Sequence, residues 1–283
     1  MSEVKQLYQN FRQQLTGLYN WRRSEHRGVL AWLMVAIFVG KDICLDRLGL
    51  YLPREAKAES VAQQFRRWLK NKAIEPRLVY DPVVTGILNK LRCRRLRVQL
   101  DRVRIKTRQN VLMLSVHYRK RAIPLAWICL DHRGHSTSTH WEELLDYLER
   151  RLKKDMQVII LADREFGSVA RLQYVADKGW AYAIRLKGNT AFYDPNWGQP
   201  VTWQELNAIA PEPGHQAWWS RLLIYKKAFY PVSLATAWAR GCDEPWFIAS
   251  NLPTGKQALR EYARRFGCEE LFSDLKKRGC LPS

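Results

Sequence analysis

Acidic residues are scarce in this sequence relative to basic ones. The 283 residues contain 27 Asp and Glu against 47 Lys and Arg, which gives a formal net charge of +20. Solubility alone does not require so large a surplus. It is greatest in the first hundred residues, which hold 19 basic and 8 acidic side chains. We therefore expect a polyanionic partner, and nucleic acid is favoured because Lys and Arg bind its phosphates with release of counterions.

Long hydrophobic runs are also missing. The best candidate, residues 28–40, is only about 13 residues long and is flanked by Arg27 and Lys41, whereas a helix needs about 20 apolar residues to cross a bilayer. The run also starts too far from the N-terminus for a cleavable signal peptide. It therefore predicts a buried helix, no membrane partner and a cytoplasmic protein.

Paired cysteines and internal repeats are absent. The six cysteines show no CxxC pair, which argues against a zinc knuckle and against a disulfide framework. We interpret them as reduced thiols, most of them in the core. Heptads, longer repeats and low-complexity tracts are not found, which argues against a coiled coil or a solenoid. With 47% hydrophobic and 12% aromatic residues, the composition is instead typical of a folded globular protein.

The N-terminal third carries a helical pattern. Apolar residues recur at helical spacing over residues 4–96, with Gly and Pro only at breaks. Within this region Ser60 is expected to cap an amphipathic helix. The polar side of that helix is basic, with Arg66, Arg67, Lys70 and Lys72. Such a helix could lie in a DNA groove, and the alternative is a solvated basic face on an ordinary helix.

The pattern changes near residue 96. Residues 96–105, 111–119 and 122–131 are short β-type runs separated by polar turns, which predicts an antiparallel meander. The following pattern predicts helices at 141–154 and 169–178, strands at 158–162 and 180–186, β structure over 189–250, and a helical segment from about residue 256. The fold class is therefore α/β, with a mixed sheet.

Two aspartates occupy unusual positions in these strands. Asp101 falls in the middle of the first β-type run, and Asp163 follows the apolar strand at 158–162. Carboxylates there are costly to bury unless they are paired or bind cations. Their oxygens suit Mg²⁺ or Mn²⁺, and two such ions about 4 Å apart can drive phosphodiester chemistry. The alternative is structural, with each Asp paired to its neighbour, Arg102 or Arg164.

A third carboxylate lies in the last helical segment. If residues 261–278 form one helix, four polar residues fall within an arc of about 60° on one face: Tyr262, Arg265, Glu269 and Lys276. An ordinary amphipathic helix with paired charges is the alternative, since such helices are common.

The spacing of these four residues resembles the Y-(2)-R-(3)-E-(6)-K signature of DDE transposases of bacterial insertion sequences, in the large group named for insertion sequence four. The segments LADREFGS around Asp163 and PWFIASNL before the signature also look like this family, as does the run around Asp101. The resemblance covers about residues 20–280. It implies a ribonuclease-H-like mixed-sheet catalytic core with a β-rich insertion, preceded by an all-helical N-terminal region.

The implied domains are a helical DNA-binding region at 1–95, the first part of the core at 96–188, the insertion at 189–250, and the segment with the third acidic residue at 251–283. The resemblance implies that Asp101, Asp163 and Glu269 hold two Mg²⁺ or Mn²⁺ ions. Tyr262, Arg265 and Lys276 would hold phosphates at the transposon end. Arg164 would contact DNA or serve the fold.

The implied activity is metal-dependent cleavage at the terminal inverted repeats of an insertion sequence, followed by strand transfer into target DNA by a homodimer on double-stranded DNA. The chain ends seven residues after Lys276, whereas members of the family usually continue with further apolar helices, so we expect a C-terminal truncation. A second hypothesis is therefore a catalytically impaired DNA-binding remnant or inhibitor of transposition. A repair or resolving nuclease is a third, and the signature argues against it.

Overall fold

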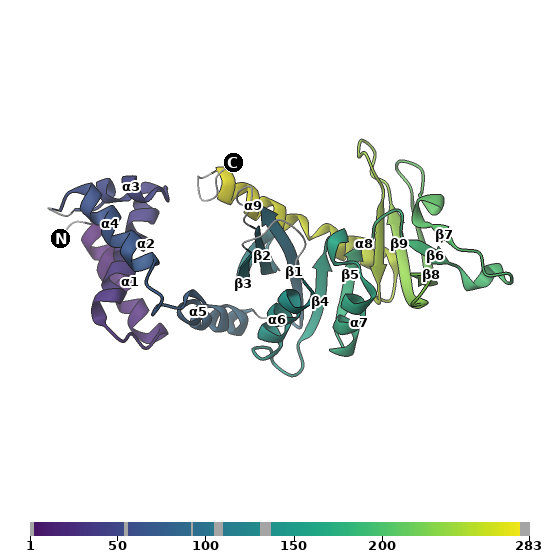
Figure 1. Cartoon of the computed structure of the whole chain (residues 1–283), viewed down its shortest axis with the longest axis horizontal. Helices are drawn as coiled ribbons and strands as arrows, with labels where there is room; N and C mark the ends of the chain where they lie inside the picture. The colour runs from purple at the N-terminus through teal and green to yellow at the C-terminus, as the bar shows by residue number, and fades with distance from the viewer. Residues whose placement is uncertain (1–2, 54–55, 92, 105–109, 131–136, 278–283) are drawn as a thin grey trace. The chain divides into compact units, whose positions relative to one another are not determined.

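The computed structural model describes residues 3–53, 56–91, 93–104, 110–130 and 137–277, except for the side chains of 138 and 274–277 (Figure 1). The chain divides into two compact units. One contains residues 1–92 and 273–283, and the other contains residues 93–272. Each unit is described by itself.

The N-terminal unit is helical, as the apolar periodicity predicted. Its elements are α1 (Glu3–Leu18), α2 (Ser24–Gly40), α3 (Leu45–Leu48), the short 3₁₀ helix η1 (Gly49–Tyr51), α4 (Ala58–Leu69) and α5 (Pro76–Lys90). Its core is built around Val35, Leu48 and Phe65, which are fully buried. Helices α1 to α4 thus share one apolar centre and leave most of their charged residues outside it.

Two predictions for this unit have different outcomes. The hydrophobic run at 28–40 forms most of α2, with Ala31, Val35 and Ala36 buried. Among the described residues no single helix is long and apolar enough to span a membrane, although α2 and the segment Leu45–Tyr51 pass that test as a pair bent by 90°. The prediction that Ser60 caps a helix is wrong: α4 begins at Ala58, after Lys57, so Ser60 lies inside its first turn.

The second unit is built on one mixed sheet. The meander consists of β1 (Arg95–Arg104), β2 (Asn110–Tyr118) and β3 (Arg121–Leu130), and β4 (Gln157–Ala162) and β5 (Ala181–Arg185) follow. Strand β2 pairs antiparallel with β1 and β3, whereas β4 pairs parallel with β1 and β5. The predicted α/β class, the meander and the buried parallel strand are confirmed. Figure 1 shows β1 between β2 of the meander and the parallel strand β4.

Helices connect and cover these strands. Helix α6 (Ser138–Glu149) links β3 to β4, and η2 (Arg164–Phe166) and α7 (Val169–Asp177) link β4 to β5. Helix α6 ends at Glu149, so it is shorter than the sequence predicts. Near the C-terminus, α8 (Gly255–Ala263) packs on the sheet through Leu259 and Tyr262, in a cluster with Ile159 and Leu161.

The β-rich segment extends this same sheet. It contains β6 (Ala191–Tyr193), η3 (Pro195–Trp197), β7 (Gln204–Glu205), η4 (Leu206–Ile209), β8 (Gln216–Ile224), β9 (Tyr230–Ala237) and β10 (Trp246–Ser250). The ten strands have the order β3-β2-β1-β4-β5-β10-β9-β8-β6-β7. Strands β8 and β9 form a hairpin, with positive φ at Tyr225 and Phe229 in its turn. Strand β10 returns the chain to β5 and thereby places α8 on the core strands.

The cysteines are mostly outside the core, contrary to the prediction. Cys44, Cys93, Cys129 and Cys242 are exposed, and among the described cysteines only Cys268 is buried. The four exposed thiols lie in loops, at an element end or on β3, where hydrophobicity alone does not ensure burial.

Candidate active site

Strand β1 turns a polar face toward the C-terminal helices. Arg97, Gln99 and Asp101 alternate with the buried Leu96, Val98 and Leu100, so the three polar residues share one side of the strand. The parallel register pairs Leu100 with Ala162 of β4. Asp101 and Asp163 each follow one member of that pair, so the strands bring both carboxylates to the same level of the sheet.

Asp101 is a buried carboxylate with two donors. It is 9% exposed, its Oδ1 accepts from the backbone N–H of Arg102 at 2.8 Å, and its Oδ2 accepts from Nη1 of Arg265 at 2.7 Å. Burial raises the pKa of Asp101 to about 6, against the opposing effect of Arg265 and the Arg102 amide, and the charges of Asp163 and Glu269 raise it further. The three acidic residues therefore act on one another electrostatically.

Asp163 follows β4 directly and begins η2. Its Oδ1 is buried and has no hydrogen-bond partner in the described part of the chain. The structural alternative, in which each aspartate pairs with its neighbouring arginine, is wrong for these side chains. Arg102 pairs with Glu165 at 2.7 Å, and Arg164 pairs with Glu244 at 3.2 Å. A buried carboxylate oxygen without a donor is costly unless a cation compensates it.

Arg265 links Glu269 to Asp101 of strand β1. Nη2 of Arg265 donates to Oε1 of Glu269 at 2.5 Å while Nη1 holds Asp101. Burial lowers the pKa of Arg265, but Tyr262 and the three carboxylates outweigh it and raise this pKa above its usual range. Among the described residues, Arg265 thus contacts Asp101 and Glu269, and Asp163 acts on it through its charge. Glu269 itself is half-exposed.

The expected single helix is broken. Helix α8 ends at Ala263 and α9 (Phe266–Lys277) begins at Phe266, with Arg264 and Arg265 in the turn between them. The expected common helical face of the signature residues is therefore wrong: Tyr262 lies on α8, and Glu269 and the backbone of Lys276 lie on α9. The Lys276 side chain lies outside the described residues.

Tyr262 is a core residue in this structure. Its side chain is 1% exposed and its ring contacts Trp246 edge to face, with centroids 5.1 Å apart. Burial raises the pKa of Tyr262 to about 12, and the guanidinium of Arg265 lies 5.7 Å from the ring centroid. The Tyr262 ring therefore packs near the guanidinium of Arg265. A direct contact between Tyr262 and DNA stays a prediction.

A second polar layer lies beside the carboxylates, and the sequence analysis missed it. Glu261 of α8 is fully buried and accepts from Arg97 at 2.5 and 3.0 Å and from Arg264 at 2.6 Å. Gln99 donates to the Arg264 carbonyl at 2.5 Å. The only signal for this layer in the sequence was the alternation of polar and apolar residues in β1. Such alternation usually indicates a strand with one face in solvent, but here the C-terminal helices cover the polar face.

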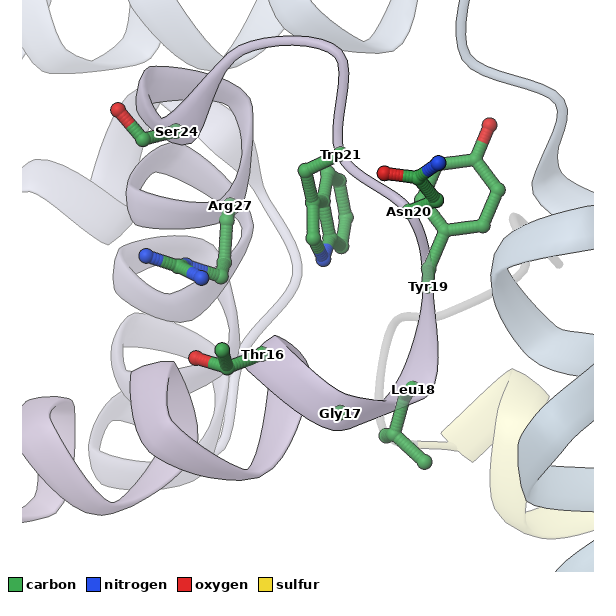
Figure 2. A pocket seen from close by; sticks show the side chains of 8 residues that line it. All are labelled: Thr16, Gly17, Leu18, Tyr19, Asn20, Trp21, Ser24 and Arg27. Carbon is green, nitrogen blue, oxygen red and sulfur yellow. The ribbon is translucent and has the colours of Figure 1, made fainter.

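The predicted basic residues of the N-terminal unit lie on or next to α4. Arg67 and Lys70 are exposed, and Arg66 pairs with Asp46 at 2.5 Å. A polar pocket of about 450 Å³ lies elsewhere in this unit, at the turn between α1 and α2 (Figure 2). It is lined by Trp21 and Arg27, among others, and the buried Nε of Arg27 has no partner within the described ranges.

The family model of the transposase DDE domain matches residues 96–281. The chain belongs to this family. A comparison with curated proteins gives no match. The transposase DDE match begins at the second residue of β1 and covers the rest of the ten-stranded sheet together with α8 and α9, so it contains Asp101, Asp163 and Glu269.

Enzymes of the transposase DDE family catalyse phosphoryl transfer and generally use divalent metals. Carboxylate oxygens are the donors that Mg²⁺ and Mn²⁺ prefer, and the unpartnered Oδ1 of Asp163 fits such an ion. Within the described ranges, however, no group of three or more Asp, Glu, His or Cys side chains lies close enough together to hold an ion. Arg265 explains this spacing, because its guanidinium occupies the place between Asp101 and Glu269.

Proposed function

We propose that the chain is a DNA transposase that cuts DNA at the ends of an insertion sequence and joins the ends to target DNA. The observation that carries the proposal is that Asp101 and Asp163 lie at the same level of two neighbouring strands while Arg265 joins Asp101 to Glu269, inside a transposase DDE match. The strand order β3-β2-β1-β4-β5, a meander followed by two parallel strands with helical crossovers, supports a ribonuclease-H-like core.

The three carboxylates would hold one or two Mg²⁺ or Mn²⁺ ions. Bound there, such ions supply an activated oxygen nucleophile and stabilise the departing oxygen of a phosphodiester. Asp101 is largely ionised at neutral pH even though burial raises its pKa to about 6, so it can act as a ligand. Its position beside Asp163 on a buried strand gives the pair a rigid base.

Arg265 would change partners during binding. Its guanidinium holds Asp101 and Glu269 in the structure, and the same fork can hold a phosphate through two hydrogen bonds. A DNA phosphate that draws Arg265 away would free both carboxylates for metal. Arg164 is half-exposed and, among the described residues, pairs with the half-exposed Glu244. It is a second candidate for a phosphate contact.

The N-terminal unit would add affinity for double-stranded DNA, since most of the positive charge of the first hundred residues lies there. Arg66, Arg67 and Lys70 stay the proposed contacts. We further propose that two copies act together on the DNA ends, which light scattering of the protein–DNA complex would test.

The decisive experiment incubates the protein and Mg²⁺ with the DNA that flanks its coding sequence and maps the resulting 3′ ends. We expect nicks at both ends of the element, and we expect Asp163→Asn to abolish them. The exposed Asp177 provides a matched control, since Asp177→Asn makes the same chemical change outside the site. Binding without nicking would instead favour the DNA-binding inhibitor, and neither binding nor nicking would refute both readings.

A further inference from the structure

The break between α8 and α9 has an unusual hydrogen-bond pattern. The amide of Gly267 bonds the carbonyl of Arg264, and the amide of Cys268 bonds the carbonyl of Arg265. These bonds span three residues rather than the four of an α-helix. The Cys268 amide therefore does not make the α-helical bond to the Arg264 carbonyl, which also accepts a bond from Gln99 of β1.

The side chain of Gln99 binds that carbonyl. Its Nε2 donates to the Arg264 carbonyl at 2.5 Å, while its Oε1 accepts from the hydroxyl of Ser115 on β2 at 3.3 Å. The side chain of Gln99 is fully buried. An amide buried among strands and used at both ends has one orientation, because any other would leave a polar atom unpaired.

The Arg97–Glu261 pair holds the α8 side of the same break. Arg97 contacts both carboxylate oxygens of Glu261, and Arg264 adds a third bond to the same group. Three residues on one face of β1 thus bind consecutive parts of the break. Arg97 binds the Glu261 carboxylate and Gln99 binds the Arg264 carbonyl. Asp101, the next residue on that face, accepts a hydrogen bond from Arg265.

Helix α9 leaves the break in close contact with the sheet. A Cβ atom at Gly267 would lie 3.3 Å from Nδ1 of His117 and 3.5 Å from Nε2 of Gln99. The first turn of α9 therefore sits directly on the Gln99 amide. Glu269 belongs to that turn, so the direction of α9 at the break decides where its carboxylate lies.

We propose that Gln99, assisted by the Arg97–Glu261 pair, is a positioning residue that fixes the α8–α9 break and so sets Arg265 and Glu269 against Asp101. The role in the reaction rests on the proposed function. Gln99 touches no reacting group. It acts by holding the backbone between two residues that do, and small displacements of such groups slow catalysis strongly.

The buried Cys268 reports the state of the break directly. It follows Gly267, its thiol contacts the Ser115 hydroxyl, and its side chain is fully buried, so it should react slowly with an aromatic disulfide reagent. With the other five cysteines replaced by Ser, Gln99→Met should raise the labelling rate of Cys268 at least about tenfold, since a break without its anchor opens more often. Arg97→Gln should give a smaller rise.

Thr236→Val is the matched control. Thr236 is fully buried in β9 and donates to the carbonyl of Ala217 at 3.3 Å, so this variant also removes a buried bond from a side chain to a backbone carbonyl. It should lower the melting temperature as Gln99→Met does but leave Cys268 labelling within about twofold of wild type. Equal labelling in Gln99→Met and Thr236→Val would overturn the inference, because the amide would then be merely structural.

Cleavage kinetics test the link to the reaction. Gln99→Met should lower kcat by about tenfold or more while the Kd for DNA stays within about twofold; unchanged kcat would refute the positioning role. If wild type cuts no DNA, the proposed function fails, and Cys268 labelling still decides whether Gln99 holds the break.

Discussion

The two units of this protein both contain Arg–Asp ion pairs, but the pairs differ in exposure to solvent. In the helical unit Arg66 pairs with Asp46 at the surface, with side chains 37% and 66% exposed, around an apolar core. In the sheet unit Arg265 pairs with Asp101 at 7% and 13% exposure. Water screens the exposed pair, so its Arg can still bind a phosphate. In the buried pair, loss of either residue would leave an unpaired buried charge. Exposure, not residue type, separates a binding surface from a built site.

The largest stability effect should come from a buried acid. Glu261→Gln leaves Arg97 and Arg264 facing a neutral amide, which should cost about 3 kcal/mol in the free energy of unfolding. Asp46→Asn breaks the exposed pair with Arg66 and should cost less than about 1 kcal/mol. Urea unfolding of both variants measures the contrast. Comparable losses would mean that the difference in burial does not govern the two ion pairs.

Arg265→Gln should separate metal binding from cleavage. Removing the guanidinium frees Asp101 and Glu269, so Mn²⁺ should bind several-fold more tightly in the absence of DNA. Cleavage should nevertheless fall about 100-fold, because the phosphate loses its bidentate partner. Mn²⁺ titration and single-turnover cleavage provide the two readouts. Arg260→Gln, an exposed change on α8, should alter neither, and weaker Mn²⁺ binding in Arg265→Gln would contradict the exchange of partners.

Low pH should reduce the stability that the ionised carboxylate of Glu261 contributes. Burial would raise the pKa of Glu261, but Arg97 and Arg264 outweigh it and hold this pKa below its usual range. The stabilisation is therefore present above the unfolded pKa of about 4.3 and is lost as pH falls through the lower folded pKa. Wild type should exceed Glu261→Gln in stability at pH 7, and the gap should shrink below about pH 4. A gap that stays constant to pH 3 would argue against an ionised Glu261.

The smallest effects should come from the helical unit. Arg27 and Arg67 have no carboxylate partner in the described part of the chain, so each is available for a DNA phosphate. Replacing either by Gln should weaken DNA binding a few-fold and lower the salt slope of log K by about one. Fluorescence anisotropy at several salt concentrations measures this. Lys153→Gln, an exposed change in the sheet unit, is the control, and an equal loss there would indicate that only net charge matters.

Some features could be predicted from local sequence because they depend on local periodicity. The helical N-terminal region, the meander, the strand before Asp163 and the α/β class follow from which positions are apolar. The three acidic residues could be selected from their positions in strands and from a spaced signature. The spacing did not reveal that the helix breaks at Arg264, because i to i+3 and i to i+4 hydrogen bonding share nearly the same side-chain pattern.

By itself, the sequence determined the charge surplus and the order of the elements, since these reside in composition and periodicity. Tertiary structure decided which polar residues are buried. Gln99 and Glu261 resemble solvent-facing residues in the sequence, and they are fully buried only because α8 and α9 close over β1. Long-range packing placed Arg265 between Asp101 and Glu269, 164 residues from the former, and no local pattern encodes such a contact.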